Sequence, residues 1–233
     1  MKPAQLNGIK TYPFSSVHEL ITFAAEQKGI LVAVNAEKLM NGDGEIHGII
    51  NENIGYPDGI GAVWALRKKG FKNAVKLPGC ELWLHIVRRY YQEKSFYLVG
   101  SHSEVIKTTV KRLQEEFPGI QIAGYRDGYL KSDEERQALL HDISAKKPDI
   151  VFVAMGSPKQ ELLMAEMQKQ HPAMYQGLGG SFDIYAGKSK RAPVVFQKFG
   201  LEWLYRLLQE PTRLGRYLTL VKFFLILNFT KKI

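Results

Sequence analysis

The chain has 233 residues, of which 45% are hydrophobic, and its only cysteine is Cys80. This length suits one α/β domain with an appendage or at most two small domains, and the composition excludes a disordered or low-complexity chain. A formal net charge of +9 favours an anionic partner such as phosphate groups, nucleic acid or an acidic membrane surface, and a lone cysteine excludes an intrachain disulfide.

Apolar runs typical of buried strands alternate along the chain with helical patterns. The sequence predicts strands at residues 30–34, 96–99, 120–123, 150–154 and 174–178, and helices at residues 60–69, 81–93, 104–117, 134–146 and 160–170. Such alternation predicts βαβ units and a mainly parallel sheet. We therefore expect residues 1–195 to form one doubly wound α/β domain, with helices on both faces of its sheet.

Asp58 lies just before the first of these helices, with Gly59 between them. Asp is a favoured N-cap residue, and this is the simpler reading of Asp58. The functional alternative is a general base, because a carboxylate beside a bound substrate can take the proton of an incoming hydroxyl group. The sequence leaves both interpretations open.

Three predicted helix starts have the sequence pattern of a capping box, with a serine three residues before Glu or Gln. Their serines are Ser101, Ser132 and Ser157. The first and third follow a strand and a glycine directly. These junctions predict helix N-termini at the carboxyl edge of the sheet, where open α/β folds bind ligands.

The run Gly156, Ser157, Pro158, Lys159 and Gln160 is the most informative of these junctions. With Ser157 as the cap and Pro158 at the first helical position, free N–H groups would attract a phosphate, and Lys159 would add a positive charge. The equally supported alternative is that Ser157 and Gln160 merely cap a helix.

A second glycine cluster, with Gly179, Gly180 and Asp183, follows the last predicted strand. Glycines there let a ligand approach the backbone closely. Neither this cluster nor residues 59–64 forms a dinucleotide fingerprint: the latter run has Trp64 where a small residue must pack and lacks a convincing preceding strand. A P-loop is also absent, so NAD or ATP binding is not expected.

The sequence contains no Asp-x-Asp pair of the kind that holds a metal ion on a nucleotide sugar. We expect no metal and no cofactor, so positive side chains and helix dipoles would have to neutralise a departing diphosphate. For each candidate alone, a solvated surface charge is the more common role. The candidates are Lys159, Arg191, Arg206, Arg213 and Arg216.

The character of the chain changes after Pro193, and residues 196–233 are expected to form a helical appendage. Residues 217–227 are strongly apolar but interrupted by Lys222, and no Asp or Glu occurs from residue 211 onward. This run is too short to span a bilayer and fits an interfacial helix with basic anchors, or else a helix packed on the core. The N-terminus lacks the apolar run of a signal peptide, which predicts a cytoplasmic location.

Taken together, these segments resemble the WecG/TagA/CpsF family of glycosyltransferases, family 26. The resemblance covers nearly the whole chain, and its strength lies in the shared order of residues 34–38, 56–59, 78–83, 96–100, 127–129, 154–161, 177–183, 190–193 and 200–207. It implies a Rossmann-like domain with a C-terminal membrane-targeting appendage. The protein would then act as a peripheral enzyme on the cytoplasmic face of the inner membrane.

The resemblance also implies an activity: an inverting, metal-independent transfer from a UDP-sugar to an undecaprenyl-diphosphate-linked saccharide in cell-surface polysaccharide biosynthesis. It makes Asp58 the catalytic base and places Asn35 and Gln160 in the pocket. The appendage arginines, Arg206, Arg213 and Arg216, are implied to close over the diphosphate. We expect Gly156, Ser157, Pro158, Lys159, Gly179, Gly180, Asp183 and Arg191 to complete the substrate-binding set.

Several alternatives remain at this stage. Residues 155–161 and 200–207 resemble the N-acetylmannosaminuronic acid transferase branch, but residues 41–44 interrupt a helix usual in the family. The chain could therefore also be a teichoic-acid-type N-acetylmannosamine transferase, or a hexosyltransferase of capsule or exopolysaccharide synthesis. A homo-oligomer is a further open alternative. Rivals of other classes are a nucleic-acid-binding module, which lacks any recognised signature here, a non-catalytic membrane scaffold and a nucleotide-sugar epimerase.

Overall fold

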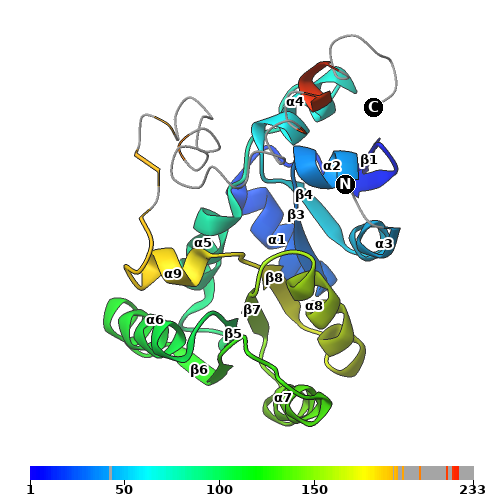
Figure 1. Ribbon diagram of the computed structural model, residues 1–233. Helices are drawn as coiled ribbons and strands as arrows, with labels where there is room; N and C mark the ends of the chain where they lie inside the picture. Colours follow the sequence, from blue (N-terminus) through cyan, green and yellow to red (C-terminus); the bar gives the residue numbers. More distant parts are fainter. Residues whose placement is uncertain are drawn as a thin grey trace. The chain divides into compact units, whose positions relative to one another are not determined.

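The computed structural model describes residues 1–41, 44–190, 192–193, 196, 205, 219 and 222–225. Its strands are β1 (Ala4–Leu6), β2 (Ile9–Thr11), β3 (Ile30–Val34), β4 (Ile54–Pro57), β5 (Ser95–Gly100), β6 (Gln121–Arg126), β7 (Ile150–Ala154) and β8 (Met174–Gly177) (Figure 1). Its helices are α1 (Val17–Gln27), α2 (Ala36–Asn41), α3 (Gly44–Glu52), α4 (Ile60–Lys68), α5 (Gly79–Tyr90), α6 (Ser103–Glu116), α7 (Asp133–Lys146), α8 (Lys159–Gln170) and α9 (Ser181–Tyr185).

Strands β3 to β8 form a six-stranded sheet in the order β4-β3-β8-β7-β5-β6. The pairs β3–β8, β8–β7, β7–β5 and β5–β6 are parallel. Every residue of β7 is buried, as expected for a central strand covered on both faces. The predicted mainly parallel α/β sheet is confirmed.

The chain divides into two compact units. The sheet unit comprises residues 17–32 and 79–189, and the hairpin unit comprises residues 1–16, 33–78 and 190–233. The predicted boundary between residues 195 and 196 is a separate matter and stays a prediction.

Helices cover both faces of the strands in the sheet unit. Helices α7 and α8 pack together on one face, and α6 and α9 lie on the other (Figure 1). The second face is centred on Trp83 of α5, which is 1% exposed. Its ring meets Phe152, Phe182 and Tyr185 edge-on, with ring centroids 5.1–5.7 Å apart. Such aromatic packing explains why the family-like segment at residues 78–83 belongs to the core.

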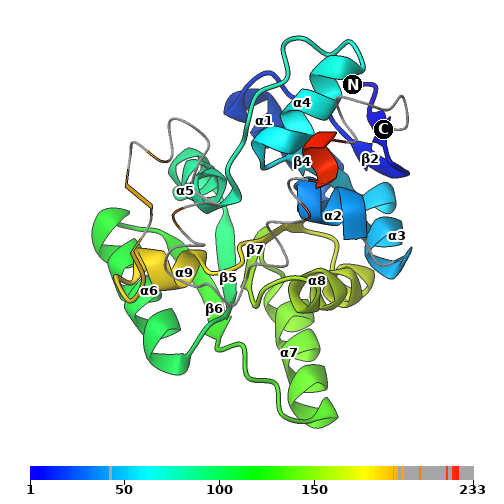
Figure 2. The same cartoon turned by 45° about the horizontal axis from the view of Figure 1, so that its top comes forward.

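The hairpin unit begins with an antiparallel pair that the sequence analysis did not predict. Asn7 and Gly8 join β1 to β2 with φ angles of 47° and 79°, the backbone that a two-residue hairpin turn requires. The Asn51 carboxamide accepts a hydrogen bond from the Lys10 N–H and donates to the Gly8 carbonyl. Figure 2 shows α2, α3 and α4 in this unit with β2 and β4 among them.

The strands predicted at residues 30–34 and 150–154 have those bounds in the structure, and the other three differ by one to three residues at an end. All five predicted helices exist, with ends shifted by up to three residues. The short elements β1, β2, β4, α2 and α9 were missed, together with α1 and α3. The expected interruption at residues 41–44 stays a prediction, because residues 42 and 43 lie outside the described residues.

Two of the three predicted capping boxes are wrong. Ser132 does cap α7, accepting from the Glu135 N–H at 3.3 Å. In contrast, α6 has His102 at its N-cap position and α8 has Pro158, neither with a side-chain cap. Ser101 and Ser157 therefore lie one residue too early to bond to the first turn of a helix.

In the C-terminal region, the described residues 196, 205, 219 and 222–225 are helical. Within the part of the chain that the structure describes, no helix is both long enough and apolar enough to cross a bilayer.

Candidate functional site

In the hairpin unit, the ends of β3 and β4 bring Asn35 and Asp58 together. The Asp58 N–H donates to the Val34 carbonyl at 3.1 Å. A Cβ atom on Gly59 would lie 3.5 Å from the Cβ of Asn35. Asp58 and Asn35 are both partly exposed. Asn35 and Asp58, two residues that the sequence predicts for one site, thus lie at the carboxyl ends of adjacent strands.

Asn35 has a structural role that the sequence analysis did not assign. Its Oδ1 accepts a hydrogen bond from the Lys38 N–H at 3.0 Å, so Asn35 is the N-cap of α2. The Lys38 ammonium in turn donates to the Ala33 carbonyl at 3.0 Å. These bonds fix the loop that carries Asn35 and hold a positive charge beside it.

Asp58 is not the N-cap of the helix that follows it. Gly59 occupies that position in α4, with an extended backbone and no side-chain cap. The simpler of the two sequence-based readings of Asp58 is therefore wrong. A strand, β4, does precede residues 59–64, contrary to expectation, while Trp64 in that run is 39% exposed.

In the sheet unit, the loops after β5, β6 and β7 converge at the carboxyl edge. The Ser101 N–H donates to the Ala154 carbonyl at 3.0 Å, and the Gly128 N–H donates to the Ser101 carbonyl at 2.9 Å. Ser101 Oγ donates to Asp183 Oδ2 at 3.0 Å, which joins α9 to the same cluster. Asp183, a predicted binding residue, thus lies at this rim.

The start of α8 differs in detail from the predicted phosphate cradle. The Ser157–Pro158 peptide bond is cis, and α8 begins at Lys159. Ser157, Pro158 and Lys159 are exposed, but the Gln160 N–H already donates to the Gly156 carbonyl at 3.0 Å. Fewer N–H groups are therefore available to a phosphate than a helix capped by Ser157 would offer.

Gln160 is buried and ties two predicted segments together. Its Oε1 accepts from the Gly179 N–H at 2.9 Å, while its Nε2 donates to Glu161 at 3.2 Å. A Cβ on Gly177 would lie 2.5 Å from Gln160 Nε2, so a glycine is needed where β8 passes the amide. In this structure the Gln160 amide holds the glycine loop after β8 against the start of α8.

Gly180, the other glycine in the predicted set, is exposed and is the N-cap of α9. Gly179 has a φ of 58°, a left-handed backbone that favours glycine. These two glycines and residues 156–159 line one rim, as expected from the sequence.

The rim also contains residues that the sequence analysis missed. Tyr129, 48% exposed, shares a 2.8 Å hydrogen bond with His102, and their rings lie 4.7 Å apart. A Cβ on Gly128 would lie 3.1 Å from the Gly100 Cα, so the two loops are in close contact. The available signal was a glycine at or near the end of each of two parallel strands, Gly100 in β5 and Gly128 two residues after β6, because such strand ends meet at one edge of a sheet.

The four predicted arginines, Arg191, Arg206, Arg213 and Arg216, lie outside the described residues. Among the described residues, no group of three or more His, Cys, Asp or Glu side chains is arranged to hold a metal ion.

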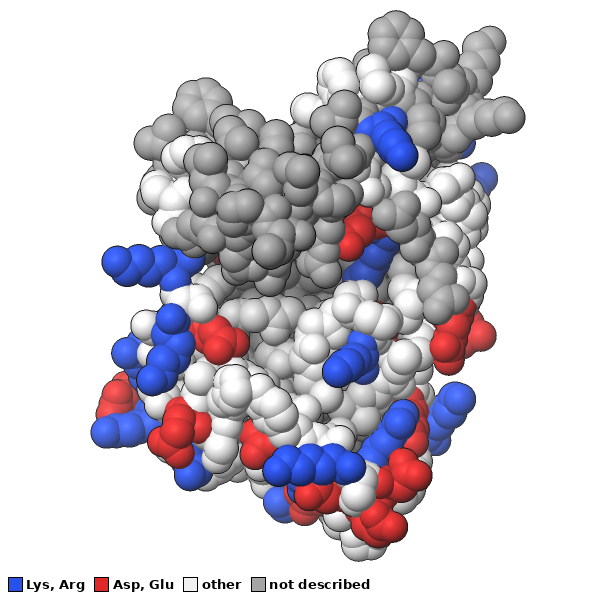
Figure 3. Space-filling model, viewed as in Figure 1, with Lys and Arg blue, Asp and Glu red and all other residues white. Residues whose placement is uncertain are grey.

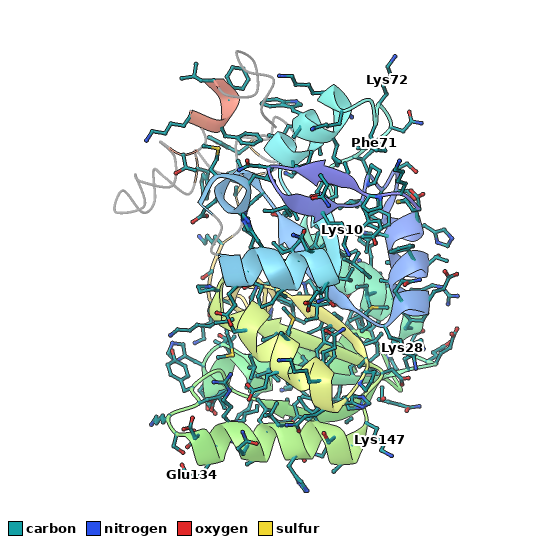
Figure 4. All side chains as sticks on the ribbon, turned by 90° about the vertical axis from the view of Figure 1, so that its right-hand side faces the viewer. Lys10, Lys28, Phe71, Lys72, Glu134 and Lys147 are labelled. Carbon is teal, nitrogen blue, oxygen red and sulfur yellow. The ribbon has the colours of Figure 1, made fainter. Side chains whose placement is uncertain are left out.

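A cavity of about 180 Å³ lies at the opposite, amino edge of the sheet unit, lined by Lys28, Lys94, Lys147, Asp149 and His171 with apolar neighbours. Figure 4 shows Lys28 and Lys147 on this edge. The C-termini of α1, α7 and α8 lie here, and their negative dipole ends account for the lysines. Ligands of parallel sheets bind at the carboxyl edge instead, so this cavity is not the candidate site.

Asp149 in that cavity anchors the amino ends of β5 and β7. Its Oδ2 accepts from the Ser95 N–H and from Ser95 Oγ, both at 2.9 Å. Burial by itself raises the pKa of Asp149, but these hydrogen bonds and the nearby Lys94 and Lys28 hold it below its usual value. The role of this carboxylate is structural.

The comparison with known families covers almost the entire chain. Residues 7–233 match the family described as glycosyl transferase WecG/TagA/CpsF. This span includes all of the sheet unit, all of the hairpin unit except residues 1–6, and each predicted site residue. The protein therefore belongs to the WecG/TagA/CpsF family and is a glycosyltransferase of cell-surface polysaccharide synthesis.

Proposed function

We propose that this protein transfers a hexosyl residue from a UDP-sugar to an undecaprenyl-diphosphate-linked saccharide, with inversion at the anomeric carbon and without a metal ion. The donor we favour carries N-acetylmannosaminuronic acid or a related N-acetylhexosamine. The family supports sugar transfer in general, and the details rest on the residues of this chain.

The observation that carries the proposal is the pairing of Asp58 with Asn35. A partly exposed carboxylate stands at the carboxyl end of β4, next to a loop that Asn35 fixes by capping α2. A general base must be accessible to the acceptor and held in position, and open α/β sheets bind ligands at the carboxyl ends of their strands. Asp58 meets both conditions, and with Gly59 as the N-cap it is not engaged in capping α4.

In the proposed reaction, the Asp58 carboxylate takes the proton of the acceptor hydroxyl. The hydroxyl oxygen forms a bond to the anomeric carbon from the face opposite UDP. The bond between that carbon and the diphosphate oxygen breaks, and its electron pair leaves with UDP. A single displacement of this kind inverts the configuration.

Charge growing on the departing diphosphate needs stabilisation that increases toward the transition state. In the sheet unit, Lys159 is exposed beside Gly156, and the exposed Gly180 lies in the loop that Gln160 holds. We assign the diphosphate to this rim, and we assign Arg191, Arg206, Arg213 and Arg216 to the closure of the site. A membrane-bound appendage would bring the last three arginines to the site only where the acceptor lies, which would limit donor hydrolysis.

The test is the variant Asp58→Asn, assayed for UDP release with a polyprenyl-diphosphate acceptor in the presence of EDTA. We expect kcat to fall about 10²- to 10⁴-fold, the usual contribution of a general base, with UDP affinity unchanged by calorimetry. Asp133→Asn, at an exposed position in the first turn of α7, is the matched control and should keep full activity. Undiminished turnover in Asp58→Asn would eliminate the base assignment.

A panel of UDP-sugars in the same assay identifies the donor. Turnover with UDP-N-acetylmannosaminuronic acid supports the favoured branch, whereas turnover only with UDP-N-acetylmannosamine supports the teichoic-acid-type alternative.

A further inference from the structure

An aromatic cluster stands exposed on the hairpin unit, where helix α4 meets residues 222–225. Trp64 of α4 is 39% exposed, Phe224 is 48% exposed and Leu225 is 50% exposed. The Trp64 and Phe224 rings meet edge-on with centroids 5.6 Å apart. Large apolar side chains exposed side by side mark an interaction surface more often than isolated ones do.

The neighbouring Phe223 packs this C-terminal segment against α4. Phe223 is only 2% exposed. A Cβ atom on Gly61, in the first turn of α4, would lie 3.0 Å from Phe223 Cε1 and 3.3 Å from the Ala36 Cβ. The helix thus has a glycine where the Phe223 ring packs. Figures 1 and 2 both show the 222–225 helix, in red, beside α4.

The two segments that build this surface share one sign of charge. No Asp or Glu occurs from Gly59 to Cys80, which covers α4 and the loop after it, and none occurs from residue 211 to the last residue. Lys69, Lys72 and Lys222 are exposed. Figure 4 shows Lys72 pointing away from the fold beyond the end of α4. Aromatic side chains with flanking lysines and no acidic residue are complementary to an anionic lipid surface.

We propose that α4 of the catalytic region and the C-terminal helix together form one lipid-binding surface, with Trp64, Phe224 and Leu225 entering the headgroup region. This inference rests on the proposed membrane-associated function, and it adds Trp64, an exposed residue of α4, to a lipid contact that the sequence assigned to the appendage alone. Indole and phenyl rings partition well into the bilayer interface, and exposed lysines bind the anionic headgroups.

The arrangement links lipid binding to the candidate base. Asp58 and Gly59 directly precede α4, and Phe223 packs against the first turn of that helix. A lipid surface that orients α4 therefore also orients the loop of Asp58 toward an acceptor embedded in the same surface.

The experiment is co-sedimentation of the full chain with vesicles of phosphatidylcholine, with and without phosphatidylglycerol. We expect Trp64→Ala to raise the lipid concentration for half-binding about fivefold to tenfold, because an indole leaves the interface. Tyr125→Ala removes an equally exposed aromatic ring from β6 and should bind like the unmodified protein. Lys72→Glu should weaken binding only where phosphatidylglycerol is present.

A second pair of variants tests the packing of Phe223 against α4. Gly61→Val should weaken vesicle binding because its side chain displaces the Phe223 ring. Gly48→Val, in α3, places the same side chain on a helical glycine with no atom within 4 Å of its added Cβ, and should have no effect. Quenching of tryptophan emission by brominated lipid gives an independent readout and should diminish in Trp64→Phe.

Equal vesicle binding by Trp64→Ala and the unmodified protein would overturn the inference. It would also be overturned if the unmodified protein self-associated through this surface and Trp64→Ala dissociated the oligomer while its vesicle binding stayed intact. UDP release by the unmodified protein is measured in parallel. If the protein releases UDP but its vesicle binding does not depend on Trp64, this inference alone is refuted. If the protein shows no transfer activity, the proposed function is refuted.

Discussion

Single polar side chains hold the loops from which the candidate site is built. Asn35 caps α2, Gln160 fastens the glycine loop to α8, and Ser101 bonds to Asp183. The sequence identified Asn35 and Gln160 as site residues only through family resemblance. Their hydrogen bonds show that both also carry loop structure, because a buried amide must satisfy its donors and acceptors.

Asp149 offers a residue-scale prediction about pH. Its pKa is lowered in the folded state, so its carboxylate stabilises the fold above the unfolded pKa of about 3.9, and this contribution is lost as pH falls through the folded pKa. We expect Asp149→Ala to reduce the free energy of unfolding by about 1–2 kcal/mol at neutral pH, from two lost hydrogen bonds at a half-exposed site.

Urea unfolding at pH 7 and near pH 3, about one unit below the unfolded pKa, measures this effect. The difference between Asp149→Ala and the unmodified protein should shrink at the lower pH. Ser95→Ala removes both hydrogen bonds of Ser95 Oγ but keeps the carboxylate and its bond from the backbone N–H of residue 95, so part of the pH dependence should remain in this variant. A difference that stayed constant down to the lower pH would contradict the assigned role of the carboxylate.

At the scale of elements, the carboxyl ends of β5 and β7 are joined too tightly for a side chain. Gly100 has a φ of 131°, and a Cβ there would lie 2.2 Å from the Ala154 carbonyl oxygen. The glycine between β5 and α6 is therefore explained by close backbone packing as well as by access for a ligand. This explains why Ser101 bonds across the rim and leaves the N-cap position of α6 to His102.

We predict that Gly100→Ala lowers the free energy of unfolding by about 3 kcal/mol or more, since it adds a clash with the backbone to an unfavourable φ. Gly119→Ala is the control: its φ is 87°, but no atom lies within 4 Å of the added Cβ. Backbone strain alone should cost this variant about 1–2 kcal/mol. Chemical unfolding of both would detect the difference, and equal losses would contradict the close approach.

At the scale of the whole molecule, the distribution of charge matters more than its sum. Figure 3 shows Lys and Arg mixed with Asp and Glu around α6 and α7 on the face displayed. Within these helices, ion pairs such as Lys107–Glu104 in α6 and Lys146–Asp142 in α7 join opposite charges. The positive excess lies in stretches that lack acids, at residues 59–80 and 211–233. This pattern favours a localised anionic surface over a nucleic-acid-binding stripe.

Deleting the residues after Pro211 should therefore weaken binding to phosphatidylglycerol vesicles, and added salt should weaken the binding of the full chain. Vesicle flotation measures both effects. An oligonucleotide should not compete with the vesicles. Full vesicle binding by the truncated chain would rule out the C-terminal segment as a lipid-binding element.

The long elements and the parallel sheet were predictable because burial on both faces of the sheet produces apolar strands separated by helical patterns. The short β1–β2 pair was missed, although Asn7-Gly8 between apolar residues is a strong hairpin signal. The strand β4 was missed because its four residues carry Gly55 and Pro57, which are uncommon in strands. Gly55 is there because a Cβ would lie 2.4 Å from the Lys10 carbonyl.

The fold class, the family and the segments that form the rim could be predicted without a structure, because they depend on local pattern and on the order of motifs. The role of each polar side chain emerged from the folded chain: Asp58 does not cap α4, Ser101 bonds to Asp183, and Gln160 holds Gly179. It also showed that Phe223 is buried against Gly61 while Trp64 is exposed. Such roles depend on which residues, distant along the chain, lie within hydrogen-bonding or van der Waals distance once the strands pair.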